Sequence, residues 1–263
     1  CTSNIGLYHL IKASSLLGHK IDTEMVGFIL APKINAPGRI DDPRKSLDLL
    51  LESDNIKAEA MAKELVRINR KRQKINSEIR DEAIEMVEKD YKNDKFLVLQ
   101  NDKWHKGVIG IVASTMVEIY HKPACIISRG YGSVRTVPEY PLLEPLRASE
   151  SLLERWGGHP MAAGLKVKKA NVAAFRKRIN EVSYMLPDDP VPYMLYDSRV
   201  HVRDANILLV SDLEKLEPFG QGNPVPHFVV EDMHIARDRI TKDGQHLQVT
   251  LRHRNHMRSA VGF

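Results

Sequence analysis

The longest regular pattern in the chain runs from about Lys57 to Lys92, without a glycine or a proline. Its apolar residues recur close to every 3.6 positions, which predicts one long helix with a packed face. A helix of this length favours a connection between two domains. Its other face carries a basic cluster that is either an ordinary solvated surface, the commoner case, or the wall of a cleft for a phosphate backbone. The cluster consists of Arg67, Arg70, Lys71, Arg72 and Lys74.

Residues 93–186 alternate short apolar runs with helical patterns, which indicates an α/β domain. Phe96–Leu99 and Ala124–Ser128 read as buried strands, Gly107–Tyr120 as an apolar helix and Asn171–Met185 as a closing helix. Between these helices lies the stretch GYGSVRT, expected as a loop. An amphipathic helix over Leu142–Trp156 and the segment GGHPMAAG follow it.

Residues 1–56 contain too little material for a domain and read as the tail of one. Ile5–Leu17 has helical periodicity. Further on, Pro32 and Pro37 are incompatible with a continuous helix, so the segment KINAPGR is expected to be an ordered loop. Asn35 and Arg39 lie in this loop, either as functional groups or as incidental polar residues of a turn.

Residues 187–263 have a different character. A proline- and aspartate-rich linker, LPDDPVP, leads into short β-rich runs, and Asp243-Gly244 is a hairpin-turn signal. Such runs predict a small β-barrel or sandwich. Its end is basic, which suits single-strand binding, but few aromatic residues are available for base stacking. The predicted fold is therefore an α/β domain joined by a long helix to a domain remnant, followed by a small OB-like β-barrel.

Composition narrows the function classes. The 263 residues are 43% hydrophobic and 28% charged, and no apolar run approaches the ~18 residues that span a membrane. Cys1 and Cys125 form no disulfide framework, so a reducing, cytoplasmic setting is expected. The first residue is not Met, which suggests a fragment. A net charge of +5 and a pI near 9.1 are compatible with a polyanionic partner but do not require one.

The candidate chemistry lies between Gly130 and Gly164. Ser133 can donate a hydroxyl hydrogen bond and Arg135 can bind a phosphate through two contacts. Gly157 and Gly158 are placed as a C-cap of the preceding helix, which would project His159 from its end. Taken singly, a glycine pair after a helix is usually a plain cap and a lone histidine usually a surface residue. Together they predict a glycine-walled pocket.

Four segments in order, LAPKINAPGR, WHKGVIGIVAS, GSVRT with GGHPMAAG, and LEPFGQGNP, resemble the RecJ family of single-stranded-DNA exonucleases. The two central motifs are similar to the DHHA1 domain of the DHH phosphoesterases. The resemblance assigns residues 1–56 to the end of a DHH domain, 57–92 to the connecting helix, 93–186 to DHHA1 and 187–263 to an OB-like domain.

The resemblance implies hydrolysis of single-stranded DNA from its 5′ end to mononucleotides, in DNA repair and recombination, with divalent Mn or Mg. It places phosphate contacts at Ser133, Arg135, Gly157 and Gly158, with Arg39 assisting and Asn35 positioning it. His159 would be the catalytic contact to the scissile phosphate or the neighbouring one. The DHH metal ligands do not occur in this sequence, so they are expected in a preceding region.

Two other functions stay open. The first is a DHH-family phosphodiesterase that acts on small nucleotides or oligonucleotides. The PFGQGNP segment and the basic C-terminal strands favour the exonuclease over this function. The second is a non-catalytic DNA-binding or assembly subunit, which the missing DHH triplet favours. The expected partner is the 5′ end of single-stranded DNA. The family also suggests a single-strand-binding protein and a recombination helicase.

Overall fold

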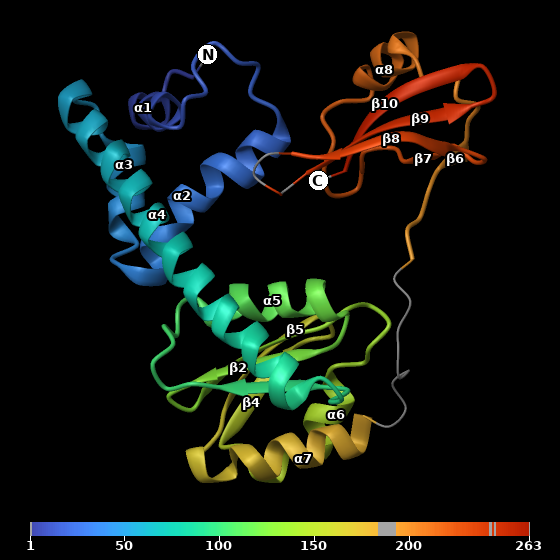
Figure 1. The fold of residues 1–263 in the computed structure, drawn as a ribbon. Coiled ribbons are helices and arrows are strands. Elements are labelled where there is room, and N and C mark those ends of the chain that lie inside the picture. The colour runs from blue at the N-terminus through green and yellow to red at the C-terminus, as the bar shows by residue number, and fades with distance from the viewer. Residues whose placement is uncertain (1, 184–192, 242–243, 245, 263) are drawn as a thin grey trace. The chain divides into compact units, whose positions relative to one another are not determined.

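A computed structural model describes residues 2–183, 193–241, 244 and 246–262, and divides the chain into two compact units, Cys1–Pro192 and Tyr193–Phe263. Figure 1 shows the elements of both units. The predicted linker LPDDPVP and the Asp243 position of the predicted turn lie outside the described residues.

The first unit begins with helices packed around a buried cluster that includes Leu10, Leu49 and Leu65. The long helix α4 (Asn55–Met86) supplies Leu65, so the earlier helices pack against its first half. These earlier elements are α1 (Ile5–Ala13), a π-helical segment η1 (Met25–Leu30), α2 (Ala31–Ile40) and α3 (Arg44–Leu51).

The segment KINAPGR is helical, so the predicted loop is wrong. It forms most of α2, with Pro32 at its second position, directly after the π-helical turn of η1. Pro37 lies inside the helix and removes the N–H that would bond the carbonyl of Lys33. Pro37 is itself buried, and α2 packs against α4. Tertiary packing therefore outweighs the local penalty of this proline.

Helix α4 (Asn55–Met86) confirms the predicted long helix and continues as the π-helical segment η2 (Val87–Tyr91). It begins where the Asp54 carboxylate accepts a 2.9 Å hydrogen bond from the Lys57 N–H. The first half belongs to the helical cluster, whereas Ile79 and Ala83 belong to the core of the α/β region. One helix is thus shared by two cores.

The α/β region is a five-stranded mixed sheet in the order β1-β2-β3-β5-β4. β1 and β2 are parallel, and the other neighbours are antiparallel. The strands are β1 (Leu97–Gln100), β2 (Ala124–Ser128), β3 (Tyr131–Arg135), β4 (Arg155–His159) and β5 (Ala162–Lys166). The helices are α5 (Ile109–Tyr120), α6 (Leu143–Ala148), the short η3 (Glu150–Leu152) and η4 (Lys169–Asn171), and α7 (Val172–Val182).

The stretch GYGSVRT corrects a second prediction, because it is a strand rather than a loop. Only Arg129 and Gly130 turn, both with positive φ (47° and 77°), and this tight turn joins β2 to β3. Ser133 and Arg135 are therefore held by the hydrogen bonds of a central strand, which fixes them more firmly than a loop would.

The predicted helix over Leu142–Trp156 is also shorter than expected, and the glycine pair is not its C-cap. Gly157 and Gly158 lie in β4 and pair with β5. A Cβ at Gly158 would lie 2.4 Å from the Ala162 carbonyl oxygen and 2.5 Å from Ala163 Cα. The close approach of the neighbouring strand, and not a left-handed helix end, accounts for glycine at this position.

The two sheet faces are covered differently, as Figure 1 shows: α4 and α5 lie on one face, α6 and α7 on the other. Ile126 of β2 packs on the α5 face, while its neighbour Cys125 is buried with Phe175 on the α7 face. Burial raises the pKa of the Cys125 thiol, so the group stays protonated.

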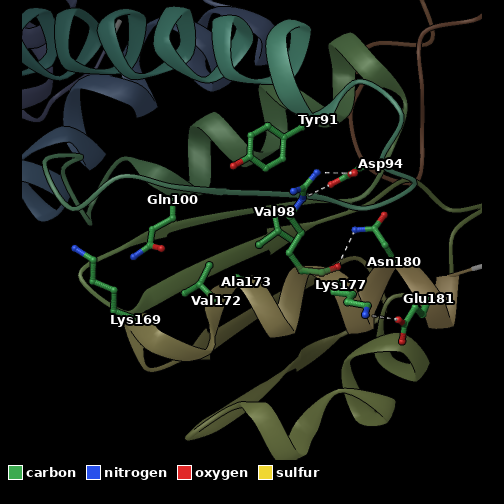
Figure 2. Close-up of a pocket in the computed structure, with 11 residues that line it drawn as sticks. Tyr91, Asp94, Val98, Gln100, Lys169, Val172, Ala173, Lys177, Asn180 and Glu181 are labelled. Atoms are coloured by element: carbon green, nitrogen blue, oxygen red, sulfur yellow. Dashed lines mark hydrogen bonds and ion pairs between the residues drawn. The ribbon is translucent and has the colours of Figure 1, made fainter.

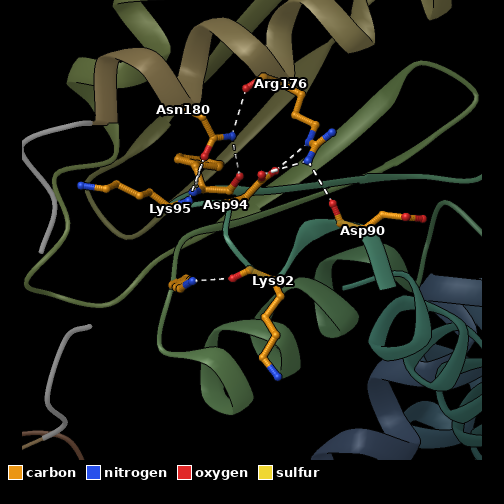
Figure 3. Close-up of polar contacts among 8 residues, drawn as sticks. Asp90, Lys92, Asp94, Lys95, Arg176 and Asn180 are labelled. Carbon is orange, nitrogen blue, oxygen red and sulfur yellow. Dashed lines mark hydrogen bonds and ion pairs between the residues drawn. The ribbon is translucent and has the colours of Figure 1, made fainter. Parts of the chain in front are cut away.

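Helix α7 is fastened to β1 by side chains (Figure 3). The Asn180 amide oxygen accepts hydrogen bonds from the N–H groups of Lys95 (2.9 Å) and Phe96 (3.0 Å), and its nitrogen donates to the Phe96 carbonyl (3.0 Å). Arg176 forms an ion pair with Asp94 at 2.6 Å. The Asn180 contacts satisfy backbone groups of the two residues just before β1.

The second unit is β-rich, as predicted, with one helix, α8 (Ile207–Glu214), among its described residues. A three-stranded antiparallel sheet has the order β10-β9-β8, and β6 pairs in parallel with β7. Closure of these strands into a barrel stays a prediction. The strands are β6 (Ser198–Arg199), β7 (Phe228–Val229), β8 (His234–Ile240), β9 (Leu247–His253) and β10 (His256–Gly262).

Candidate functional site

The registers of β3, β5 and β4 place the predicted polar residues on one sheet face. Ser133 lies opposite Gly164, which lies opposite Gly157. Two residues further along, Arg135 and His159 flank Ala162 in the same way. Directly opposed residues of antiparallel strands share a face. Two strand spacings put the Cα atoms of Arg135 and His159 about 10 Å apart.

Ser133 and Arg135 are in direct contact. Arg135 Nη1 donates hydrogen bonds to Ser133 Oγ at 3.2 Å and to the Val134 carbonyl at 2.7 Å. Helix α5 passes close to both, since a Cβ at Gly110 would lie 3.0 Å from Ser133 Oγ and 3.3 Å from Arg135 Nη2. Both side chains are half-buried between the strand and this helix. Their hydrogen-bonding groups are therefore held in place before any ligand arrives.

Arg39 reaches the same place from α2. Its Nη1 lies 3.4 Å from the Gly107 carbonyl, just before α5. The backbones also touch, because a Cβ at Gly107 would lie 1.9 Å from the Arg39 carbonyl oxygen. Asn35 is exposed one helical turn before Arg39, and no described hydrogen bond joins the two side chains. The positioning role expected for Asn35 stays a prediction.

Arg72 of α4 is a further member of this site that sequence reasoning did not single out. Its Nη2 donates a 2.6 Å hydrogen bond to Asn69 Oδ1, and the side chain is half-buried. Ile75, one turn later, and Ile40, next to Arg39, pack against the same cluster as Val108 and Ile109 at the start of α5. In the sequence Arg72 is one of five basic residues on a helix, and only partial burial distinguishes it.

Arg39, Arg72 and Arg135, here called the arginine cluster, have no ion-pair partner among the residues that the structure describes. Burial lowers the pKa of Arg72 and of Arg135, and the charge of Arg39 lowers each further. Arg72 and Arg135 are half-buried and Arg39 is exposed, and half-buried cations repelled by a third cation are unfavourable unless an anion compensates them. The arrangement therefore suits a bound phosphate, which several guanidinium groups can hold through charge-assisted hydrogen bonds.

His159 stands at the far edge of this face. It is exposed at the end of β4, and no described hydrogen bond or ion pair holds its ring. Gly157 is also exposed, while Gly158 faces the other way, against Ala163. The structure thus brings Ser133, Arg135, Gly157 and His159 onto one surface.

Comparison with known proteins agrees with this organisation. The family described as "DHHA1 domain" matches residues 93–184, and that described as "RecJ OB domain" matches residues 196–263. The single-stranded-DNA-specific exonuclease RecJ of Bacillus subtilis (strain 168) is 35% identical over 100% of this chain. The chain belongs to the RecJ family.

Two further RecJ comparisons concern Thermus thermophilus. The curated RecJ protein is 32% identical over 95% of this chain and 36% of its own length. The crystal structure of RecJ in complex with Mn2+ matches 98% of this chain and 38% of the solved one, with 32% identity and a TM-score of 0.86. The chain spans about a third of these relatives, including 34% of the Bacillus subtilis protein.

A hollow of about 750 Å³ lies between β1 and α7, apart from the arginine cluster (Figure 2). The cations that line this hollow are already neutralised, whereas those of the arginine cluster are not. The hollow therefore offers an anion no uncompensated charge. Each of its cations has a carboxylate partner: Arg176 with Asp94 at 2.6 Å, Lys169 with Asp102 at 2.7 Å, and Lys177 with Glu181 at 4.0 Å. The arginine cluster is therefore the better candidate for phosphate binding in this RecJ-family chain.

The ligand set for a divalent metal is not found within the described ranges. No group of three or more His, Cys, Asp or Glu residues there could hold a metal ion. The residues in these ranges therefore do not fit a metal centre. In the same part of the chain, no helix is long and apolar enough to cross a membrane.

Proposed function

We propose that this chain forms the substrate-binding part of a single-stranded-DNA exonuclease that degrades its substrate from the 5′ end to mononucleotides. The names of its RecJ relatives support the substrate. The observation that carries the proposal is the arginine cluster beside Ser133, which lacks a described carboxylate partner. A terminal phosphate carries more charge than an internal one, so such a cluster favours a strand end.

The proposed roles follow the sheet face. Ser133 and Arg135 hold the 5′ phosphate, and Arg39 and Arg72 add charge from α2 and α4. His159, about 10 Å away across β5, contacts a neighbouring phosphate and stabilises charge that develops there. Gly157 keeps the surface between them open. Gly158 allows β4 to approach β5 closely and thus supports the site indirectly.

The wider proposal follows the family. We place the end of a DHH domain at residues 1–56, a DHHA1 domain at 93–186 and an OB-like domain at 187–263, with 57–92 connecting the first two. Mn or Mg ions, bound by residues outside this sequence, would supply the hydrolytic chemistry. The enzyme would act in the cytoplasm in DNA repair and recombination, together with a single-strand-binding protein and a helicase. The basic strands of the second unit would give further contact to the DNA.

The test is binding of this chain to short single-stranded DNA with and without a 5′ phosphate, across a salt series. Arg135→Ala removes a charged hydrogen bond of about 1.5–3 kcal/mol, which corresponds to roughly 10- to 150-fold weaker binding of the phosphorylated strand. Arg147→Ala, an exposed arginine on α6, is the matched control. His159→Ala should weaken both DNAs alike.

Equal affinity for both DNA ends, unchanged in Arg135→Ala, would contradict the proposal, because the site would then be a generic basic surface. Tight binding of small nucleotides without a preference for longer strands would favour a phosphodiesterase of small substrates instead.

A further inference from the structure

A hollow of about 400 Å³ continues the same sheet face beyond Ser133. The next row of opposed residues is Tyr131, Lys166 and Arg155, on the side away from Arg135. Tyr131 and Ser133 are two residues apart on β3, about 6.6 Å along the strand. The hollow is therefore immediately adjacent to the proposed phosphate contact. Its lining comprises Tyr131, Gly132, Arg155, Trp156, Gly157, Gly164 and Leu165.

Two glycines, Gly157 and Gly164, form the floor of this hollow, and tight packing does not require glycine at either position. A Cβ at Gly157 would meet nothing within 4 Å, and one at Gly164 would meet only the Gly132 carbonyl oxygen at 4.0 Å. Both positions could carry a side chain without disturbing the fold. Glycine here instead leaves the backbone of two neighbouring strands accessible to a flat group.

The walls offer an aromatic ring among cations. Tyr131 is 44% exposed, which is unusual for a large residue on a strand inside a sheet. Lys166 Nζ lies 5.9 Å from its centroid and is held by Glu154 at 2.8 Å. Arg155 is exposed across the row. An accessible ring beside basic side chains is the combination on which nucleic-acid bases stack.

We infer that this hollow binds the base of the nucleotide whose phosphate lies at Ser133 and Arg135, with the base stacked on Tyr131. This inference rests on the proposed function, because the phosphate contact places the nucleotide. One ribose joins a base to its 5′ phosphate, and a similar short span separates Tyr131 from Ser133. The walls provide a ring and cations rather than a donor–acceptor pair that reads a base edge. The hollow therefore accepts any base, as an enzyme that removes successive nucleotides requires.

The experiment compares two 5′-phosphorylated dinucleotides that differ only in the first residue, one intact and one abasic. Stacking on an aromatic side chain typically contributes ~5- to 150-fold in affinity, so the abasic ligand should bind this chain more weakly by such a factor. Tyr131→Ala should remove the difference by weakening only the intact ligand, and Tyr131→Phe should retain it. Gly164→Val, which fills the floor, should act like Tyr131→Ala. The control is Tyr8→Ala, because Tyr8 on α1 is a tyrosine of similar exposure, 43%.

The phosphate and base contributions are separated by repeating each titration without the 5′ phosphate. If removing the 5′ phosphate weakens binding but removing the base does not, the base subsite is overturned and the proposed function stays intact. A base effect that Tyr131→Ala and Gly164→Val abolish supports the subsite even where the phosphate effect is absent. Equal weakening of both ligands by Tyr131→Ala overturns it, because the ring would then act through the fold and not through stacking.

Discussion

Substitution of Gly107 tests how the N-terminal helices are joined to the α/β region. In Gly107→Ala the new Cβ would lie 1.9 Å from the Arg39 carbonyl oxygen, 2.8 Å from its carbonyl carbon and 3.2 Å from its Cα. Ordinary contact begins at 3.4 Å, so the end of α2 and the loop before α5 must part by about 1.5 Å. All three atoms belong to the backbone, so no side-chain rotation can relieve the clash.

The expected cost is at the upper end of the range for overpacking, about 3 kcal/mol. For a domain of 150–250 residues this corresponds to a Tm roughly 6–12 °C lower. Displacing Arg39 by more than 1 Å would also break its proposed hydrogen bond to a bound phosphate, so affinity for 5′-phosphorylated single-stranded DNA should fall with the Tm. Thermal unfolding followed by circular dichroism and a DNA titration at a temperature well below both Tm values measure the two effects.

Gly38→Ala provides the matched control, because it makes the same change one residue from Arg39. Its Cβ would meet only Pro43 Cβ, at an ordinary 3.6 Å, and alanine inside a helix is favoured by about 0.5–1 kcal/mol. If Gly107→Ala melted at the temperature of Gly38→Ala and bound DNA equally well, the close approach of Arg39 to Gly107 would not hold the site together.

Two further changes probe other parts of the first unit. Arg72→Ala should weaken binding of 5′-phosphorylated single-stranded DNA roughly 10- to 150-fold in a fluorescence titration, whereas Lys71→Ala, its exposed neighbour, should not; equal effects would remove Arg72 from the site. Burial and a 3.0 Å hydrogen bond to Glu88 raise the pKa of Tyr120 to about 12. The folded pKa exceeds the ordinary value near 10, so this contribution to stability is complete below pH 10 and is lost as the pH rises to about 12. Urea unfolding of wild type and Tyr120→Phe across this range should show the wild type losing its advantage, and parallel curves would contradict the reasoning.

The sequence predicted the elements whose pattern is repetitive and local. The 3.6-residue recurrence through α4 and the apolar run Ala124–Ser128 correspond to elements of the fold. The predictions that were wrong applied a local rule where packing decides. Pro37 argued for a loop, but its helix is packed on α4. The pair Gly157-Gly158 argued for a helix end, but both residues pair with β5.

The residues of the candidate site could be predicted from sequence only in part, again because local motifs are visible in the sequence and packing is not. Ser133, Arg135 and His159 could be named from small-residue motifs, but their common face follows from the register of three strands, and β5 lies between β3 and β4. Arg72 could not be separated from the neighbouring basic residues. Its significance depends on burial and on the charge of Arg39, which comes from a helix more than 30 positions earlier.

Helix α4 also fixes the rotation of the two cores of the first unit relative to each other about the helix axis. Its 32 residues span about 48 Å, and each residue advances the helix by about 100°. Inserting or deleting one residue between Ile68 and Ile79 would rotate the helical core by that angle against the sheet and carry Arg39 away from Arg135. Length variation in related sequences should therefore be excluded from this segment and tolerated in exposed loops such as residues 17–20.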